Sequence, residues 1–197
     1  MGNKYRTSLT FWTMGEKYWN LSRGVCEHII RGRNKYILIS DQAIDFNECL
    51  RKTKWNDVNM AIPLLFNFYH GVELILKGFI LFSEGNGTKL DHHISELYQK
   101  FKKHYPNQKE LVTLFGRYVE KSQMPQLLCG FLDQNKLSVN RFYESLRYPF
   151  NNNLSQEYQH FVLKYQGPEG LRFYRALKAD VNKMMKLIVT LGHSLEK

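Results

Sequence analysis

Apolar side chains recur every three or four residues along most of the chain, which is the spacing of one face of an α-helix. The pattern is cleanest near the C-terminus, where it predicts a helix from Gly167-Pro168-Glu169 to about residue 192. The inward positions of this helix are Tyr174, Leu177, Val181, Met184, Ile188 and Leu191. Similar spacing predicts further helices over 9–30, 40–54, 58–84, 92–104, 108–121 and 138–147. Strand-like alternation is nearly absent, so we expect an all-α, antiparallel up-down helical bundle.

Some local features of this pattern are specific enough to check. In the helix over 40–54, Ser40 or Asp41 is placed to act as the N-cap. The predicted buried edge of the same helix consists of Ile39, Ala43, Phe46 and Leu50. Residues 122–137 are expected to form a connection, and the segment HFVLKY, 160–165, a short extended piece.

The helix over 58–84 is almost wholly apolar, yet it carries a narrow polar arc. At 100° per residue the members of this arc fall within roughly 120°: Asn59, Asn67, His70, Glu73, Lys77 and Glu84. The stretch 60–82 is long enough to span a bilayer. Near mid-membrane, however, Glu73 and Lys77 would each cost roughly 2.5–3.5 kcal/mol. We therefore expect a core helix surrounded by several neighbours, and no membrane span.

The composition indicates a soluble globular protein with an excess of positive charge. Hydrophobic residues make up 43% of the 197 residues, and the net charge is +10. Such a charge attracts polyanions and favours RNA or a nucleotide as a partner. The basic residues that could track an RNA backbone form four clusters: Arg31/Arg33/Lys35, Arg51/Lys52/Lys54, Lys100/Lys102/Lys103 and Arg172/Arg175/Lys178.

The cysteines point to a reducing compartment. There are three, at positions 26, 49 and 129, and none forms a CxxC pair. An odd number without that spacing argues against a disulfide framework and against a zinc site. The segment MGNKYRTS also lacks the apolar core of a signal peptide. We expect a cytoplasmic protein that uses no metal and no cofactor.

Three motifs in order support a family resemblance. The string PLLFNFYHGVELILK, 63–77, contains His70, Glu73 and Lys77 in a His-x-x-Glu-x-x-x-Lys pattern. The second string is DHHISEL, 91–97, a histidine-rich segment at the predicted start of the next helix. The third is RFYESLRYP, 141–149. Together these strings resemble the HEPN-domain family over roughly residues 36–192. The first 35 residues are not covered by the resemblance, so we divide the chain into a helical extension, 1–35, and a HEPN-like domain, 36–197.

The resemblance implies a four-helix core and a homodimer. It also implies RNA or nucleotide binding, RNA cleavage, and a place in toxin–antitoxin pairs or phage defence, with a possible cognate partner protein. Active ribonucleases of the family carry Arg-x(4–6)-His late in the domain, and this chain departs from that pattern. The first histidine after Arg147 is His160, and the one matching spacing, Arg23 to His28, lies in the extension. Binding without clear catalysis is therefore the expected activity.

The candidate site centres on the polar arc. Spacings of three and four place His70, Glu73 and Lys77 within reach of one another. They form either an internal network, in which Glu73 pairs with Lys77 or Arg147, or a polar cleft whose cations hold a phosphate. His92 at a helix start and Arg147 suit an anion, and Tyr148 suits stacking on a base. The predicted ligand-binding residues are His70, Glu73, Lys77, His92, Arg147 and Tyr148.

Three functions remain open at this point. The first is RNA or nucleotide binding through the candidate site. The second is a metal-independent ribonuclease, in which His70 or His92 acts as general base and Arg147 stabilises the transition state. The third is a structural dimerisation module, in which the polar arc is only an internal network.

Overall fold

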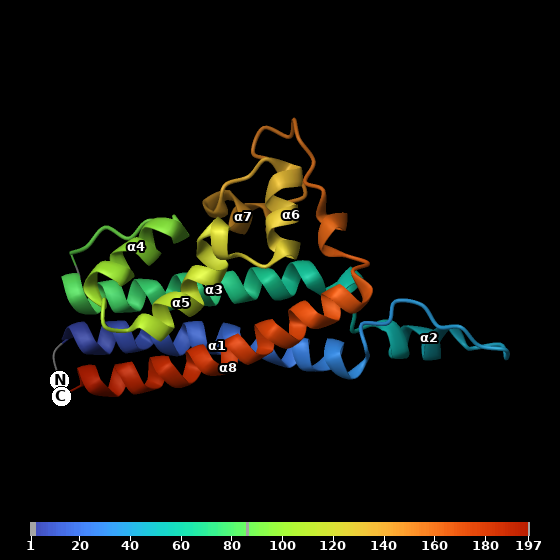
Figure 1. Ribbon diagram of the computed structural model, residues 1–197, viewed down its shortest axis with the longest axis horizontal. Coiled ribbons are helices and arrows are strands. Elements are labelled where there is room, and N and C mark those ends of the chain that lie inside the picture. The colour runs from blue at the N-terminus through green and yellow to red at the C-terminus, as the bar shows by residue number, and fades with distance from the viewer. Residues whose placement is uncertain (1–2, 86, 197) are drawn as a thin grey trace.

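The computed structural model describes residues 3–85 and 87–196, and 72% of the chain is helical. Three long helices lie along the long axis of the molecule (Figure 1): α1 (Asn3–Arg31), α3 (Asp57–Glu84) and α8 (Gly167–Leu195). Helix α1 runs antiparallel to the other two, so both ends of the chain lie at the same end of the bundle. The described ranges contain no strand, which confirms the all-α fold class.

Short helices cover one side of α3 and α8 (Figure 1). They are α4 (Ile94–His104), α5 (Lys109–Val119), α6 (Gln126–Asn135) and α7 (Val139–Ser145). Two 3₁₀ turns accompany them, η1 (Lys121–Gln123) and η2 (His160–Leu163). Two local predictions were therefore wrong. The supposed connection over 122–137 contains α6, and the segment expected to be extended forms η2, which buries Leu163 in the core.

Helices α1 and α3 pack closely because glycines on α3 face tryptophans on α1. Gly71 and Gly78 lie seven residues apart on α3, opposite Trp19 and Trp12 on α1. A Cβ atom on Gly78 would lie 2.6 Å from Trp12 Cδ1, and one on Gly71 would collide with the indole ring of Trp19. The Trp19 indole also donates a hydrogen bond to the carbonyl of Phe68 (3.0 Å). Helix α1 thus shares one core with α3, while the proposed domain boundary at residue 35 stays a prediction.

Helix α3 is the central element of the core. Sixteen of its residues are buried, Glu73 and Lys77 among them. The stretch Phe46–Glu84 contains one helix that is long and apolar enough to cross a membrane, but 78% of its most apolar window is buried inside the bundle. This burial is that of the core helix of a soluble protein.

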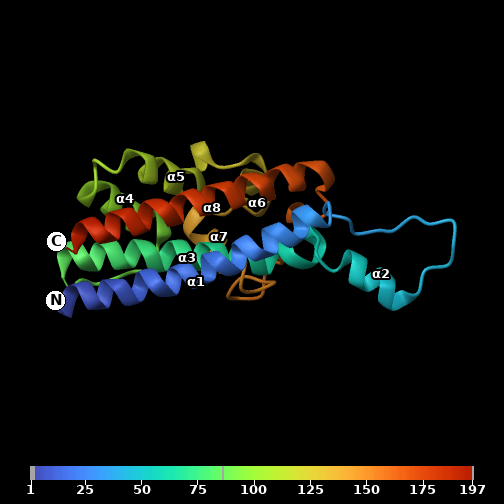
Figure 2. The same ribbon diagram turned by 90° about the horizontal axis from the view of Figure 1, so that it is seen from below.

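Residues 36–54, which we call the arm, project beyond the bundle at the end opposite the termini (Figures 1 and 2). The arm contains α2 (Phe46–Thr53), whose N-cap is Asp45 rather than Ser40 or Asp41. The Asp45 carboxylate accepts hydrogen bonds from the amides of residues 47 and 48. The predicted buried edge of this helix is wrong. Ile39, Phe46 and Leu50 are 94%, 73% and 50% exposed, because the bundle does not cover these side chains.

A buried carboxylate fixes the base of the arm. Asp57, at the start of α3, is fully buried and accepts hydrogen bonds from Asn34 Nδ2 and from the amides of Tyr165 and Gln166. These contacts join the end of α1, the start of α3 and the start of α8. Asn34 has a positive φ of 54°, a conformation that asparagine tolerates better than most residues. The two ends of the arm lie close together, since Asn56 Nδ2 donates to the Lys35 carbonyl (3.2 Å).

Candidate anion-binding site

The polar arc of α3 meets the start of α4 at a buried carboxylate. Glu73, which is 3% exposed, accepts a hydrogen bond on Oε1 from Lys77 Nζ at 2.6 Å. The same oxygen lies 2.7 Å from Nδ1 of His92, on the segment before α4. Lys77 Nζ is also 3.4 Å from that ring nitrogen. The structure therefore brings three of the predicted site residues, Glu73, Lys77 and His92, into direct contact.

These neighbours keep Glu73 ionised. Burial alone would raise the pKa of this carboxyl group, but the hydrogen bonds from Lys77 and His92, the charge of Lys77 and the nearby His70 imidazole lower it to about 2. A carboxylate at Oε1 requires a hydrogen on His92 Nδ1, which leaves Nε2 of this exposed ring available to a ligand. The second oxygen, Glu73 Oε2, is buried without a hydrogen-bond partner among the described residues.

A second layer connects His70 to Arg147 through Tyr143. His70 Nδ1 lies 3.7 Å from Glu73 Oε2, too long for a hydrogen bond, and 2.7 Å from the hydroxyl of Tyr143. Burial and the nearby charge of Glu73 raise the pKa of Tyr143 to about 12. The guanidinium of Arg147 lies over the Tyr143 ring, 4.7 Å from its centroid, which is a cation–π distance. Arg147 is thus held by an aromatic ring and does not pair with Glu73.

An open pocket of about 300 Å³ adjoins these two layers. It is lined by His92, Glu144, Arg147, Tyr148, Phe150, Asn152 and Tyr158. Three of the predicted site residues line it directly: His92, Arg147 and Tyr148. Lys77, only 7% exposed, lies behind the pocket wall with His70 and Glu73. The six predicted residues therefore form two groups, three at the pocket and three in the network that supports it.

Sequence reasoning missed two aromatic residues of this site. Tyr143, which joins His70 to Arg147, precedes Arg147 by four residues in α7 and the turn after it, so helical spacing could have indicated it. Tyr158 lines the pocket but belongs to a segment without periodicity. Its amide donates to the Pro149 carbonyl (2.8 Å), which folds the segment back over the pocket.

Neither alternative histidine belongs to the site. His160 is half-buried, stacks on Phe131 and lies 2.7 Å from the carbonyl of Ser145, so it ties η2 to α7. His28 stacks on Trp55, with ring centroids 4.4 Å apart, at the base of the arm. Both histidines are occupied by packing contacts.

Acidic neighbours form ion pairs with residues of three of the four predicted basic clusters and so reduce their positive charge. Lys52 pairs with Glu48 (2.8 Å), and Arg172 pairs with Glu169 (3.3 Å). Other pairs are Lys100–Glu84, Lys102–Glu120 and Lys178–Glu27. Within the described ranges, the cluster Arg31/Arg33/Lys35 forms no ion pair. An RNA-binding surface stays a prediction. The cluster Arg31/Arg33/Lys35 at the base of the arm is the one of the four whose positive charge no described ion pair neutralises.

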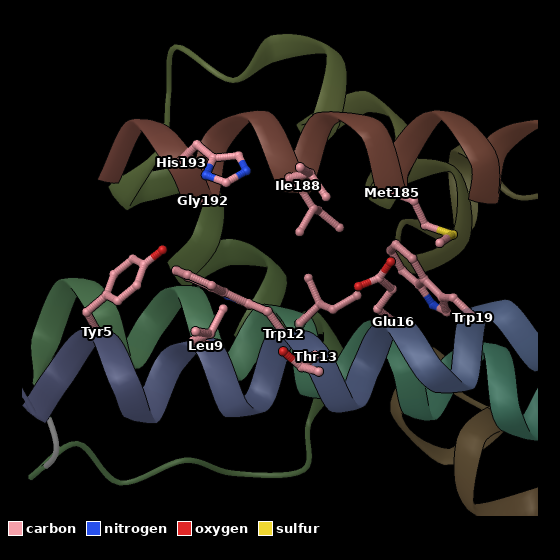
Figure 3. Close-up of a pocket in the computed structure, with 12 residues that line it drawn as sticks. Tyr5, Leu9, Trp12, Thr13, Glu16, Trp19, Met185, Ile188, Gly192 and His193 are labelled. Atoms are coloured by element: carbon pink, nitrogen blue, oxygen red, sulfur yellow. The ribbon is translucent and has the colours of Figure 1, made fainter. Parts of the chain in front are cut away.

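A second cavity lies between α1 and α8 (Figure 3). The figure shows Trp12 and Trp19 rising from α1 toward Met185 and Ile188 of α8. The lining is mostly apolar, with Glu16 as its one carboxylate. This groove has no converging cations, so we do not assign it to an anionic ligand.

One group of side chains has the spacing of a metal site. Asp91, His93 and Glu96 place one ligand atom each within 4.8 Å of one another. All three are exposed, and His93 Nδ1 already lies 3.3 Å from Asp91 and 3.2 Å from Glu96. Among the described residues no buried side chain is paired with this cluster, which is an exposed charge network at the start of α4.

Comparison of the chain with protein-family models, with curated proteins and with solved structures found no match. The HEPN resemblance therefore stays a prediction that rests on the three sequence motifs. The geometry of the site is independent of it.

Proposed function

We propose that the protein binds RNA or a nucleotide at the pocket lined by His92, Arg147 and Tyr148. The supporting observation is that an exposed imidazole, an exposed guanidinium and an exposed phenol ring line one pocket, above a buried network that holds two of them. The planar guanidinium suits a phosphate, and the ring of Tyr148 suits a base. The remaining charge in the wall, Glu144, has Arg141 as an ion-pair partner at 3.7 Å.

The buried network positions the pocket residues. Glu73 fixes the tautomer of His92 and directs Nε2 outward, while Tyr143 supports Arg147 from below. Because the side chains are oriented before a ligand arrives, less conformational entropy is lost on binding.

The test is a binding titration with fluorescein-labelled RNA of mixed sequence and, separately, with ATP. Arg147→Ala should weaken binding roughly 10- to 100-fold, since a charge-assisted hydrogen bond is worth about 1.5–3 kcal/mol. The matched control is Arg6→Ala, which removes an exposed arginine of α1 that lies outside the pocket. This control should bind within about twofold of wild type, and affinity should fall as salt rises. Equal loss in both variants, or no binding by wild type, would contradict the proposal.

RNA cleavage is a second candidate function, favoured by one observation. The exposed His92 is hydrogen-bonded to a buried carboxylate next to an arginine, which is the arrangement of an oriented general base. Cleavage of the RNA probe that is lost in His92→Ala and kept in His93→Ala would assign a metal-independent ribonuclease. Intact RNA after prolonged incubation would leave binding alone.

The biological setting follows from the family resemblance. We place the protein in the cytoplasm, in a bacterial defence or toxin–antitoxin system, with a HEPN-like four-helix core, a homodimer and a possible cognate partner protein. If the protein binds neither RNA nor nucleotide, the remaining hypothesis is a structural dimerisation module with an internal polar network.

A further inference from the structure

The cavity between α1 and α8 is small and partly enclosed. Helix α1 contributes Trp12, Glu16 and Trp19 to its wall, and α8 contributes Met185 and Ile188. Its volume is about 120 Å³. An engineered apolar cavity of roughly 150 Å³ is large enough to bind benzene. The space therefore suits a ligand with one ring or a short branched chain.

The wall of this cavity contains a carboxylate without a partner. Glu16 is partly buried and points from α1 toward α8, beside Trp19 (Figure 3). It forms no hydrogen bond or ion pair with any of the described residues. Two other acids in the described ranges, Asp41 and Glu157, also lack such a partner, but both are exposed to water. Partial burial removes water from a carboxylate, which costs free energy unless another polar group replaces it.

Tryptophan rings flank this carboxylate on both sides along α1. Trp12 precedes Glu16 by four residues and Trp19 follows it by three, so all three side chains lie on one face of the helix. The other two positions at these spacings hold Thr13 and Asn20, so α1 itself supplies no neighbouring cation. The face of an indole ring attracts a cation within about 6 Å of its centroid. The carboxylate and the rings thus favour the same kind of ligand charge.

The surroundings of the cavity are acidic although the chain as a whole is basic. The chain has 28 lysines and arginines, yet none of those in the described ranges lines the cavity. His193 lines it, but its Nδ1 lies 3.6 Å from the carboxylate of Glu196. Burial and the charge of Glu196 raise the pKa of Tyr5, another wall residue. Negative charge is therefore present at Glu16 and again at the end of α8.

We propose that this cavity binds a small apolar amine in its protonated form. The ring or branched chain of the ligand occupies the apolar space beside Ile75 and Ile188. The ammonium group donates a hydrogen bond to Glu16 and lies against the indole rings. A neutral ligand would leave Glu16 without a partner, and an anionic one would be repelled. The site is separate from the pocket of Arg147, and the inference does not depend on the ligand proposed there.

The first test compares three probes of similar shape and different charge by isothermal titration calorimetry at pH 7. They are phenethylammonium, 2-phenylethanol and 3-phenylpropionate. Ligands of this size bind weakly, so the titrations should extend to about 10 mM. The ammonium probe should bind roughly tenfold more tightly than the alcohol, and the carboxylate most weakly. Tryptophan fluorescence should change during the same titration, because Trp12 and Trp19 line the cavity.

The second test removes the charge of Glu16 while keeping its shape. Glu16→Gln should weaken binding of phenethylammonium about tenfold and leave the affinity for 2-phenylethanol within about twofold of wild type. Because Glu16 has no partner among the described residues, the variant should keep the thermal midpoint of wild type. The matched control is Asp41→Asn, which removes the charge of an exposed and unpaired acid on the arm. It should bind the amine as wild type does.

A third variant shows where the probe binds. Gly192 lines the cavity on α8, and a Cβ atom there would lie 3.8 Å from the ring of Trp12, an ordinary contact. The further atoms of Gly192→Leu extend into the cavity, so this variant should bind neither the amine nor the alcohol. Equal affinity of wild type for the two probes, or no binding of the amine, overturns the proposal. So does unchanged amine affinity in Glu16→Gln, and amine binding that persists in Gly192→Leu places the ligand elsewhere.

Discussion

At the scale of single residues, Glu73 is the group on which the site depends. It is buried at 3% exposure, yet Lys77 and His92 both approach Oε1 within 2.7 Å. A buried carboxylate with such partners is ionised over the physiological pH range, and it carries the negative charge that keeps Lys77 tolerable inside the bundle. The same contact orients His92 at the pocket wall. Stability and site geometry are therefore linked through one side chain.

This linkage predicts a specific loss of stability in acid. The pKa of Glu73 is about 2 in the folded protein, against an ordinary value of 4.5. A carboxyl group with a lowered folded pKa contributes stability above pH 4.5 and loses it as the pH falls from 4.5 toward 2. The shift corresponds to about 3 kcal/mol of unfolding free energy. Urea denaturation of wild type between pH 6 and pH 2 should show this loss.

Glu73→Gln separates this contribution from those of other acids. Glu27, Glu48, Glu84 and Asp91 also have lowered pKa values, so every variant loses some stability in acid. With each curve referred to its own value at pH 6, the variant should lose about 3 kcal/mol less than wild type. Parallel curves for the two proteins would show that Glu73 is not the titrating group.

The pairing of Glu73 with Lys77 could be predicted, because four residues of helix place the two side chains on one face. The contact between His70 and Tyr143 could not, because these residues are 73 positions apart and meet only through the packing of α7 on α3. Arg147 was expected to reach Glu73 or a ligand. Its cation–π contact with Tyr143 depends on the same tertiary packing.

At the scale of elements, periodicity identified helices better than it identified their buried faces. The predicted face of α8 is buried throughout. In α1, however, Met14 and Leu21 are about half exposed, although both fit an apolar stripe. The face of α1 is set instead by Trp12 and Trp19, which occupy the space left by Gly78 and Gly71. A pattern of hydrophobicity alone does not show that two glycines on another helix will accept these rings.

The glycine contact predicts opposite effects of two Gly→Ala substitutions. Gly71→Ala forces a methyl group against the Trp19 ring and should lower the unfolding free energy by about 1–3 kcal/mol. Gly24→Ala, on α1, meets nothing within 4 Å and should raise it by roughly 0.5–1 kcal/mol, the difference in helix propensity. Urea denaturation of both variants measures the two effects. Destabilisation of equal size in both would mean that the Trp19–Gly71 contact does not determine the packing of α1.

At the scale of the whole molecule, the fold separates a compact bundle from the arm. The amphipathic pattern of residues 40–54 predicted a helix, and α2 occupies the second half of that range. Its apolar face was assigned to the core because a sequence pattern is the same whether the face is covered by its own bundle or by another molecule. Only the structure shows that Phe46 and Leu50 lie outside the bundle, joined to it at a base that Asp57 holds together.

This separation predicts that the arm can be removed without unfolding the bundle. The arm ends at neighbouring points, with Asn56 Nδ2 3.2 Å from the Lys35 carbonyl, so a short Gly-Ser linker can replace residues 37–52. Shortening the loop changes its closure entropy by less than about 1 kcal/mol. The deletion variant should keep the wild-type thermal midpoint and the RNA affinity of the pocket. A variant that unfolds would mean that the arm belongs to the core.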